Sequence, residues 1–229
     1  MKIKKIFYYF TKTEITLWSC SIALIITSFF IFKSESYLTL FSSIIGTTSL
    51  IFNAKGHPLG QLFMVVFSIF YGIISYSFSY YGEMITYLGM TMPISILAFI
   101  SWLRNPYEKN KSEVKVNSLN TKETIYMWIL TVFTTVCFYF ILKYCNTSNL
   151  ILSTLSITTS FLAAYLSYKR SPYFAVAYAC NDVVLISLWF FASIENTQYI
   201  SVVVCFISFL ANDIYGYINW MKLRKRQSR

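Results

Sequence analysis

Eight apolar runs, separated by short polar breaks, constrain the fold of this chain more than any other feature of its sequence. A helix needs about 20 apolar residues to cross the hydrocarbon core of a bilayer. Because no water there satisfies backbone groups, each run must be a helix. With 56% hydrophobic and 12% charged residues, the chain is not an ordinary soluble domain. The runs are Ile15–Phe32, Tyr37–Phe52, Leu59–Tyr81, Met84–Leu103, Ile125–Tyr144, Leu150–Tyr168, Tyr173–Ile194 and Tyr199–Trp220.

The basic residues predict which side of the membrane each break occupies. Eight spans place both termini on one side, and 17 of the 19 Lys and Arg residues fall on that side, while only Lys33 and Lys143 fall on the other. Positive charge gathers in cytoplasmic loops, so we expect both termini in the cytoplasm. The net charge of +10 is mostly this effect and does not indicate nucleic-acid binding.

A pattern in the first half of the chain recurs in the second. Lys55-Gly-His-Pro58 leads into a long run, an acidic break at Tyr81-Gly-Glu83 and a run that ends at Trp102. Lys169-Arg-Ser-Pro172 leads into a long run, a break at Glu195 and a run that ends at Trp220. Each copy follows another apolar run, so the repeated unit is three helices.

The single run between the two units, Ile125–Tyr144, sets their relative orientation. A three-helix unit starts and ends on opposite faces, and one linking helix returns the chain to the first face. The two units are therefore parallel, an arrangement that places substrate near the midplane between them. We predict an all-α integral membrane protein of eight transmembrane helices, with one extra N-terminal helix and two parallel three-helix repeats joined by a linking helix.

This architecture divides the chain into five parts. The extra helix is expected to face lipid or another subunit, and the polar stretch 104–124 to be a solvated linker. The parts are an N-terminal interfacial segment and extra helix (1–35), the first repeat (36–103), the cytoplasmic loop and linking helix (104–148), the second repeat (149–221) and a basic cytoplasmic tail (222–229).

Enzymatic chemistry finds little support in the sequence. No Walker A or GxSxG pattern occurs, and His57 has no second His or Cys at a metal-ligand spacing. The five cysteines lie scattered in or beside apolar runs and are expected to be packing residues. We therefore expect no enzyme activity, no cofactor and no metal site.

Two Asn-Asp pairs in the last two runs are the strongest candidates for a binding site. Ionisable residues at membrane depth are costly, so Asp182 and Asp213 are functional-site candidates. Amides, a carboxylate and aromatic rings together suit a planar, hydroxylated, uncharged or cationic solute. The candidate substrate-binding residues are Tyr178, Asn181, Asp182 and Trp189 in one run, Asn212, Asp213 and Tyr215 in the next, and, more weakly, Tyr71 and Ser95 in the first unit.

An alternative role for these polar groups is interhelical hydrogen bonding that only holds the bundle together. Two similar pairs in adjacent runs favour binding over this alternative. In the first unit, Gly89 and Pro93 interrupt one span, and broken helices often line a transport pathway.

Several segments together resemble the PnuC family of bacterial vitamin transporters. The resemblance extends from about Tyr37 to the tail, and its most specific segments are YYGEM at 80–84 and NDIYGYINW at 212–220, joined by SWLRNP at 101–106 and EVKV at 113–116. It implies a 3+1+3 fold, a homotrimer in the bacterial inner membrane, and uptake of nicotinamide riboside by facilitated diffusion, with a cytosolic kinase that traps the product.

Carried onto this chain, the family's polar positions fall on Asp182, Trp189 and Asn212. Two positions depart from the pattern of nicotinamide riboside transporters, because Tyr178 stands where tryptophan is expected and Ser95 where glutamine is expected. Two alternatives therefore stay open. One is a transporter of thiamine or another vitamin, and the other is the substrate-binding subunit of an ATP-driven vitamin importer.

Overall fold

The computed structural model describes residues 9–32, 36–77, 80–107, 110–147 and 149–228. These residues form eight stretches of helix long and apolar enough to cross a membrane, which confirms the predicted fold class. The strands β1 and β2 pair antiparallel in a two-stranded hairpin. The elements are α2 (Lys12–Ile31), α3 (Tyr37–Ala54), α4 (Leu59–Ser77), α5 (Tyr81–Thr86), the π-helix η1 (Tyr87–Thr91), α6 (Met92–Arg104), β1 (Pro106–Tyr107), β2 (Asn110–Val114), α7 (Thr121–Tyr144), α8 (Leu150–Tyr168), α9 (Phe174–Glu195), the 3₁₀ turn η2 (Thr197–Tyr199) and α10 (Ile200–Gln227).

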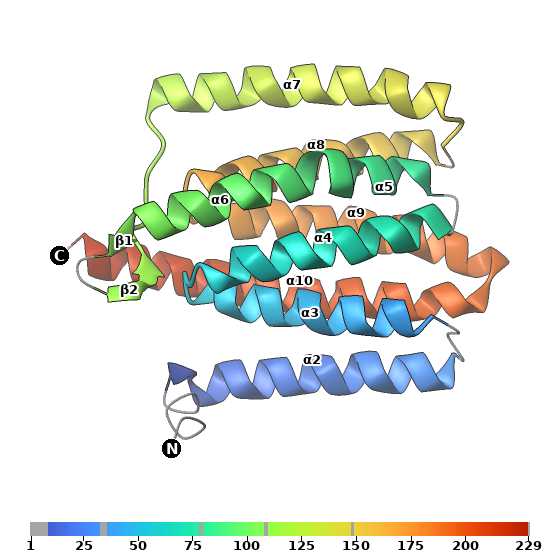
Figure 1. Cartoon of the computed structure of the whole chain (residues 1–229), viewed down its shortest axis with the longest axis horizontal. Coiled ribbons are helices and arrows are strands. Elements are labelled where there is room, and N and C mark those ends of the chain that lie inside the picture. The colour runs from blue at the N-terminus through green and yellow to red at the C-terminus, as the bar shows by residue number, and fades with distance from the viewer. Residues whose placement is uncertain (1–8, 33–35, 78–79, 108–109, 148, 229) are drawn as a thin grey trace.

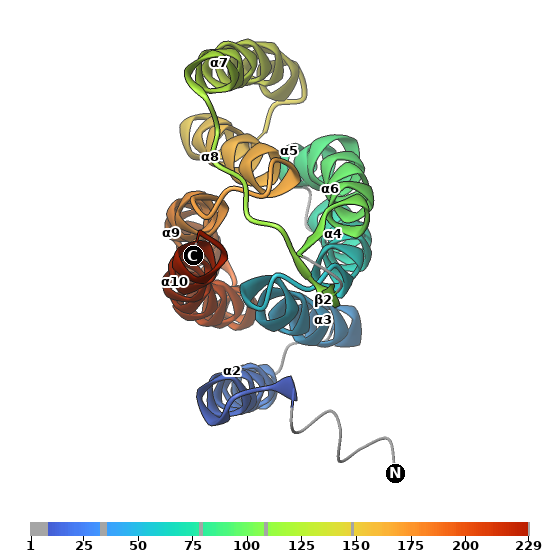
Figure 2. The same ribbon diagram turned by 90° about the vertical axis from the view of Figure 1, so that its left-hand side faces the viewer.

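The helices of the two repeats close into a ring. Going round it, α3 packs on α4, α4 on α6, α6 on α8, α8 on α9, α9 on α10, and α10 on α3 (Figure 2). The extra helix α2 and the linking helix α7 lie outside the ring on opposite sides (Figure 2). The first turn of α2 and the last turn of α10 lie at one end of the bundle, which we call the near end, and we call the other the far end (Figure 1).

Reciprocal hydrogen bonds fasten the two interfaces between the repeats at the near end. The Trp102 indole Nε1 of the first repeat donates to the Ser167 carbonyl at 2.9 Å, and the Trp220 Nε1 of the second donates to the Asn53 carbonyl at 2.7 Å. One residue earlier, Ser101 Oγ donates to the Tyr168 carbonyl and Asn219 Nδ2 to the Ala54 carbonyl. The acceptors are last-turn carbonyls of α3 and α8, which need partners from outside the helix.

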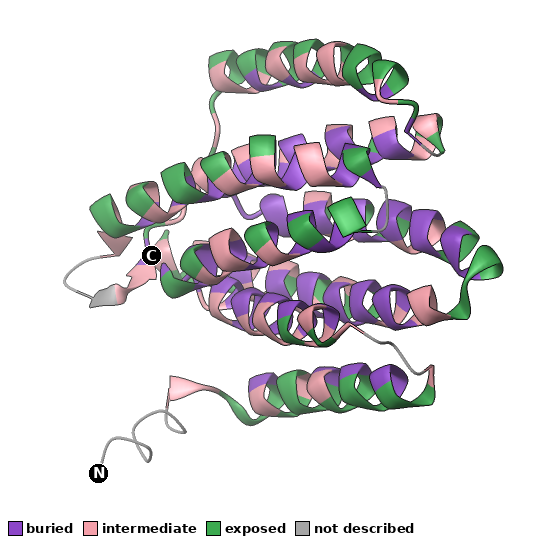
Figure 3. Ribbon diagram, turned by 45° about the vertical axis from the view of Figure 1, so that its right-hand side comes forward, coloured by how far each residue is buried: buried purple, intermediate pink, exposed green. Residues whose placement is uncertain are grey.

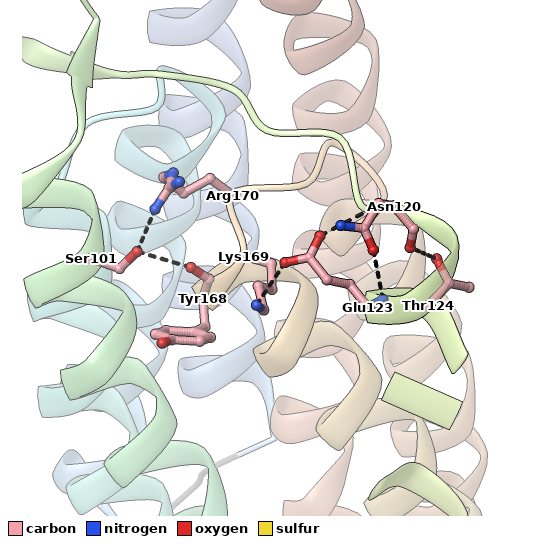
Figure 4. Close-up of polar contacts among 7 residues, drawn as sticks. All are labelled: Ser101, Asn120, Glu123, Thr124, Tyr168, Lys169 and Arg170. Carbon is pink, nitrogen blue, oxygen red and sulfur yellow. Dashed lines mark hydrogen bonds and ion pairs between the residues drawn. The ribbon is translucent and has the colours of Figure 1, made fainter. Parts of the chain in front are cut away.

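The turns that follow α3 and α8 also match. Gly56 and Arg170 occupy equivalent positions, and both have left-handed backbone, with φ of +68° and +58°. Glycine adopts this conformation without the strain that a Cβ brings. The Arg170 side chain instead reaches across to Ser101 Oγ, 2.7 Å from its Nη1 (Figure 4).

The helix before each repeat begins with the same capping box. In α2 the Thr11 side chain accepts from the Glu14 backbone and the Glu14 carboxylate accepts from the Thr11 backbone, and Asn120 and Glu123 do the same at the start of α7. Each glutamate then pairs with the equivalent lysine of its repeat: Lys55 Nζ lies 3.4 Å from Glu14, and Lys169 Nζ lies 2.9 Å from Glu123 (Figure 4). The extra helix is therefore the counterpart of the linking helix.

The extra helix α2 has two different sides. Its outer side is exposed, as at Phe30 (67%), but its other face packs on α3 and α10 within the same chain. Figure 3 shows this pattern for the whole bundle, with buried residues facing the ring and exposed ones on α2 and α7 facing outward. In a membrane protein such apolar outer faces meet lipid or another subunit.

The stretch 104–124 is not simply a solvated linker, as the sequence had indicated. It carries the β1–β2 hairpin, and Val114 at its end is fully buried. Similarly, Glu83 is not in a break between spans. It lies in the first turn of α5 and is fully buried.

Candidate functional site

Asp182 on α9 and Asp213 on α10 meet in the interior of the bundle. They are only 3% and 4% exposed, and their carboxyl groups lie within hydrogen-bonding reach of each other. Asp182 Oδ2 has no hydrogen-bond partner among the described residues. Two buried carboxyl groups without a basic partner are destabilising, and such an arrangement is retained where it serves a function.

Tyr178 is the aromatic neighbour of this carboxyl pair. It lies one helical turn before Asp182, is 8% exposed, and its hydroxyl is within electrostatic range of both carboxyl groups. Tyr178, Asp182 and Asp213 are thus brought together as the sequence predicted.

Tyr87 joins the first repeat to this pair, and sequence reasoning missed it. Its hydroxyl lies within electrostatic range of Asp182, Tyr178 and Glu83 and interacts with the Asn181 amide. Tyr87 opens the π-helix η1, which precedes Pro93. π-helical turns are rare and frequently mark functional sites. The predicted break at Gly89 and Pro93 is therefore present as a π-helix. Tyr87, the residue that approaches the second repeat, is the first residue of that π-helix.

Trp189 and Tyr71 lie toward the far end and bond to each other. The Trp189 Nε1 donates to the Tyr71 hydroxyl at 2.7 Å, and the Tyr71 ring packs against Tyr87 with centroids 4.4 Å apart. Tyr80 and Tyr199 also pack on the Trp189 ring, at 4.8 and 5.7 Å. We call Tyr71, Tyr80, Trp189 and Tyr199 the far aromatic cluster. Trp189 is about 10 Å along the helix from Asp182, toward the far end.

Asn181 is largely committed to holding helices together. Its Oδ1 accepts hydrogen bonds from Thr159 Oγ1 and Ser160 Oγ of α8, at 2.8 and 3.0 Å. Its amide also interacts with Tyr87. In this structure the Asn181 side chain therefore joins α9 to α8.

Asn212 and Tyr215 both hydrogen-bond to α2, and Asn212 also donates to the Ser208 carbonyl of its own helix at 2.7 Å. Asn212 Nδ2 donates to Ser21 Oγ at 2.9 Å, and the Tyr215 hydroxyl donates to Glu14 Oε1 at 3.0 Å. Asn212 is 1% exposed, and its Oδ1 has no partner among the described residues. The structure thus divides the predicted residues of α10 between two sides of that helix, and a substrate contact by Asn212 or Tyr215 stays a prediction.

Further buried polar atoms without partners in the described residues line the first repeat. Ser95 Oγ on α6 is one, at 2% exposure, and both carboxylate oxygens of the fully buried Glu83 lack a hydrogen bond that meets ordinary geometry. A cavity of about 10 Å³ beside Tyr71 is lined by Thr39 and Ser42, whose hydroxyls are also unpartnered. Such groups are expected where a polar solute or water binds.

Together these residues form a polar layer between two aromatic ones. At the near end, Trp102, Phe174 and Trp220 pack together, with centroids 4.9 to 6.2 Å apart, and we call them the near aromatic cluster. No Lys or Arg occurs in 37–54, 59–103, 150–168 or 171–221. The layer can therefore hold a solute that carries positive charge and hydroxyl groups.

His57 does not contribute to this layer. It lies in the turn after α3, where its Nδ1 accepts a hydrogen bond from the Leu59 backbone at 3.1 Å. Burial lowers the pKa of His57, so the ring is neutral at pH 7. Over the described residues, no three His, Cys, Asp or Glu side chains are grouped as metal ligands.

Residues 36–222 match the family model described as nicotinamide mononucleotide transporter. Among curated proteins, the nicotinamide riboside transporter PnuC of Neisseria mucosa is 26% identical over 87% of this chain and 77% of its own length. The Haemophilus influenzae protein of the same name is 24% identical over 84% and 82%. A crystal structure of the vitamin B3 transporter PnuC superposes with a TM-score of 0.82 at 25% identity, over 95% of this chain and 94% of the other.

Proposed function

Since this chain belongs to the nicotinamide mononucleotide transporter family and is a multi-pass membrane transporter, we propose that it takes up nicotinamide riboside by facilitated diffusion. Two relatives that match most of its length bear the name nicotinamide riboside transporter. Phosphorylation of the product by a cytosolic kinase then keeps it in the cell.

The carboxyl pair of Asp182 and Asp213 is the reason for proposing the riboside as substrate instead of the mononucleotide. Nicotinamide riboside is a cation with a neutral ribose, whereas the mononucleotide adds a phosphate. While the two carboxyl groups share a proton the pair carries at most one negative charge, and no Lys or Arg occurs in 171–221 to neutralise it, so the pair attracts the cationic ring and repels a phosphate. Tyr178 and Tyr87 add aromatic faces beside the pair, suited to stacking and cation–π contact.

Calorimetry on the purified protein tests the substrate. We expect nicotinamide riboside to bind, and nicotinamide mononucleotide to bind at least tenfold more weakly. Asp182→Asn should weaken riboside binding about 10- to 150-fold, because hydrogen bonds to charged groups contribute ~1.5–3 kcal/mol. Glu195→Gln is the matched control, as it removes an exposed carboxylate at the far end of the same helix. Equal affinity for both ligands would contradict the proposal.

The passive mechanism is tested separately from the substrate. In proteoliposomes, uptake should equilibrate without overshoot and survive a protonophore. Among the described residues of the two repeats, Asp182, Asp213 and Glu83 are buried carboxyl groups suited to carry a proton, so a protonophore that stops uptake would make one of them a coupling residue. Uptake by this chain alone also excludes an importer subunit that depends on a partner ATPase.

Thiamine or another vitamin is the second candidate substrate. Tyr178 beside the carboxyl pair and Ser95 with its unpartnered hydroxyl are the two departures that favour it. Both vitamins carry a cationic ring, so the carboxyl pair alone does not separate them. If the protein binds thiamine and ignores the riboside in the same calorimeter, these departures determine the substrate.

Sidedness follows from the basic residues of the near end. We propose a bacterial cell (inner) membrane location with both termini in the cytoplasm, because 17 of 19 Lys and Arg residues lie on the side of the termini. Reporter fusions at Ser36 and at Arg229 should give opposite compartment signals. Matching signals would contradict this topology.

A homotrimer is proposed for the assembled protein, with its contact on α6 and α7. The helix α2 packs on both of its neighbours, α3 and α10, whereas its counterpart α7 packs mainly on α8. This leaves apolar residues such as Leu97 (53%) and Phe133 (66%) exposed. A Phe133→Asn, Phe140→Asn variant should lower the mass measured by native mass spectrometry, while the control Phe30→Asn on α2 should not. A monomeric wild type would overturn the proposal.

A further inference from the structure

The residues 113–117 cross the near end of the bundle and bond to four separate elements. We call them the strap. Val114 N donates to the Gly56 carbonyl at 3.0 Å, in the turn of the first repeat, and Asn117 N donates to the Arg170 carbonyl at 3.0 Å, in the turn of the second. Between them, Lys115 N donates to the Asn105 carbonyl at 2.9 Å and Val116 N to Gln227 Oε1 of α10 at 2.7 Å. The strap thus ties the two repeats together.

Gln227 makes three hydrogen bonds to the strap. Besides accepting from Val116, its Nε2 donates to the Val114 carbonyl at 3.1 Å and to Glu113 Oε1 at 2.9 Å. Arg226 adds an ion pair to Glu113. These contacts come from the last turn of α10, which projects from the ring at the near end (Figure 1).

The strap covers the near aromatic cluster. Val114 is fully buried and packs in one apolar group with Trp102, Phe174 and Trp220. Phe174 in turn contacts Tyr178, with ring centroids 6.2 Å apart. A solute that leaves the carboxyl pair toward the near end meets these rings first and the strap after them.

We infer that the strap and the near aromatic cluster form the gate through which substrate leaves the bundle at the near end. The inference rests on the proposed transport function. Opening requires the reciprocal tryptophan bonds and the strap to separate at the same two interfaces between repeats. Because Gln227 and Glu113 are only partly buried, their bonds exchange with water at low cost, as a part that opens and closes requires.

Thiol labelling measures opening without any substrate. Ser167 is 1% exposed, and its carbonyl accepts from Trp102 of the near aromatic cluster; it is replaced by cysteine, a change of similar size. A water-soluble maleimide should label Ser167→Cys slowly, and at least tenfold faster when Glu113→Ala and Gln227→Ala are added. Peptide mass spectrometry follows this site without removal of the native cysteines. Ser118→Cys, which is exposed next to the strap, is the control and should label fast in both backgrounds.

A reversible cross-link tests whether the strap controls transport. Glu113→Cys and Gln227→Cys are bridged by a short reducible bis-maleimide, since their side chains meet in the native protein. Bridging should reduce proteoliposome uptake at least tenfold, reduction should restore it, and the binding constant should change less than threefold. The single variants treated with the same reagent are the controls.

Several results would overturn the inference. They are equal labelling of Ser167→Cys with and without the strap bonds, fast labelling in the parent, or full uptake by the bridged protein. Loss of binding in the unbridged parent instead contradicts the proposed substrate, and leaves the labelling result standing on its own.

Discussion

The two repeats share one frame but have different centres. At the near end they match residue by residue: each closing tryptophan donates to the other repeat, each turn has a left-handed residue, and each lysine pairs with the glutamate of a capping box. Midway along the bundle the match ends. Asp182 and Asp213 both belong to the second repeat.

Equivalent positions show how the centres differ. Asp213 and Ser95 each lie seven residues before the closing tryptophan, and Asp182 and Ser68 each lie ten residues after the turn proline. Ser68 Oγ donates to its own helix, at the Met64 carbonyl, 2.8 Å away. The first repeat instead supplies Tyr71 and Tyr87. The bundle thus has a symmetric frame and an asymmetric centre, and under the proposed function the second repeat would provide the carboxyl pair that binds the solute.

The largest effect is expected where the repeats are most alike. Trp102→Ala and Trp220→Ala should each lower the free energy of unfolding by ~3–5 kcal/mol, since both side chains are fully buried. The two losses should agree within about 1 kcal/mol, as measured by unfolding in detergent. Trp18→Ala is the control, because Trp18 is 37% exposed on α2. A large difference between the two losses of unfolding free energy would mean that only one of the two interfaces stabilises the bundle strongly.

Substitutions at the equivalent positions Asp213 and Ser95 should have different effects on riboside binding. Asp213→Asn should weaken riboside binding about 10- to 150-fold, for the loss of an interaction with a charged group worth ~1.5–3 kcal/mol. Ser95→Ala removes a hydroxyl that has no partner among the described residues, and should change affinity less than about tenfold. Calorimetry on both variants decides. If Ser95→Ala is the more damaging, the first repeat determines affinity.

The paired glutamates provide a comparison outside the site. Glu14 is 1% exposed and also accepts from Tyr215, so Glu14→Gln should destabilise the protein by ~1–3 kcal/mol. The Glu123 side chain is 31% exposed, and its pair with Lys169 should be worth ~0.2–1 kcal/mol. Unfolding in detergent at low salt measures both. If the two glutamates contribute equally to stability, the deeper burial of Glu14 does not strengthen its interactions.

The sequence predicted the frame well because its signals are local. Run lengths, the recurring Lys–Pro turn and the closing tryptophans each depend on a few adjacent residues, and they gave eight helices and two parallel repeats. The sequence also selected Asp182 and Asp213 as candidates for one binding site, and the structure places them together.

What the sequence did not predict depends on rotation and long-range contact. Asn212 follows the same polar stripe as its neighbours, but only the packing of α2 shows that it bonds to Ser21. The strap looked solvated because its burial comes from one side chain, Val114. Tyr87 stood among many aromatic residues, and the nearby Gly89 and Pro93 were the available signal that its turn is irregular.

Tyr87 offers the finest test of the comparison, because it is the part of the first repeat that reaches the second. Tyr87→Phe keeps the ring and removes the hydroxyl that interacts with Asn181 and faces Asp182. A net hydrogen bond contributes ~0.5–1.5 kcal/mol, so riboside binding should weaken about 2- to 12-fold. Tyr81→Phe is the matched control, since Tyr81 is 37% exposed one and a half turns earlier. An unchanged affinity in Tyr87→Phe, with Asp213→Asn impaired, would confine binding to the second repeat and leave the first as its frame.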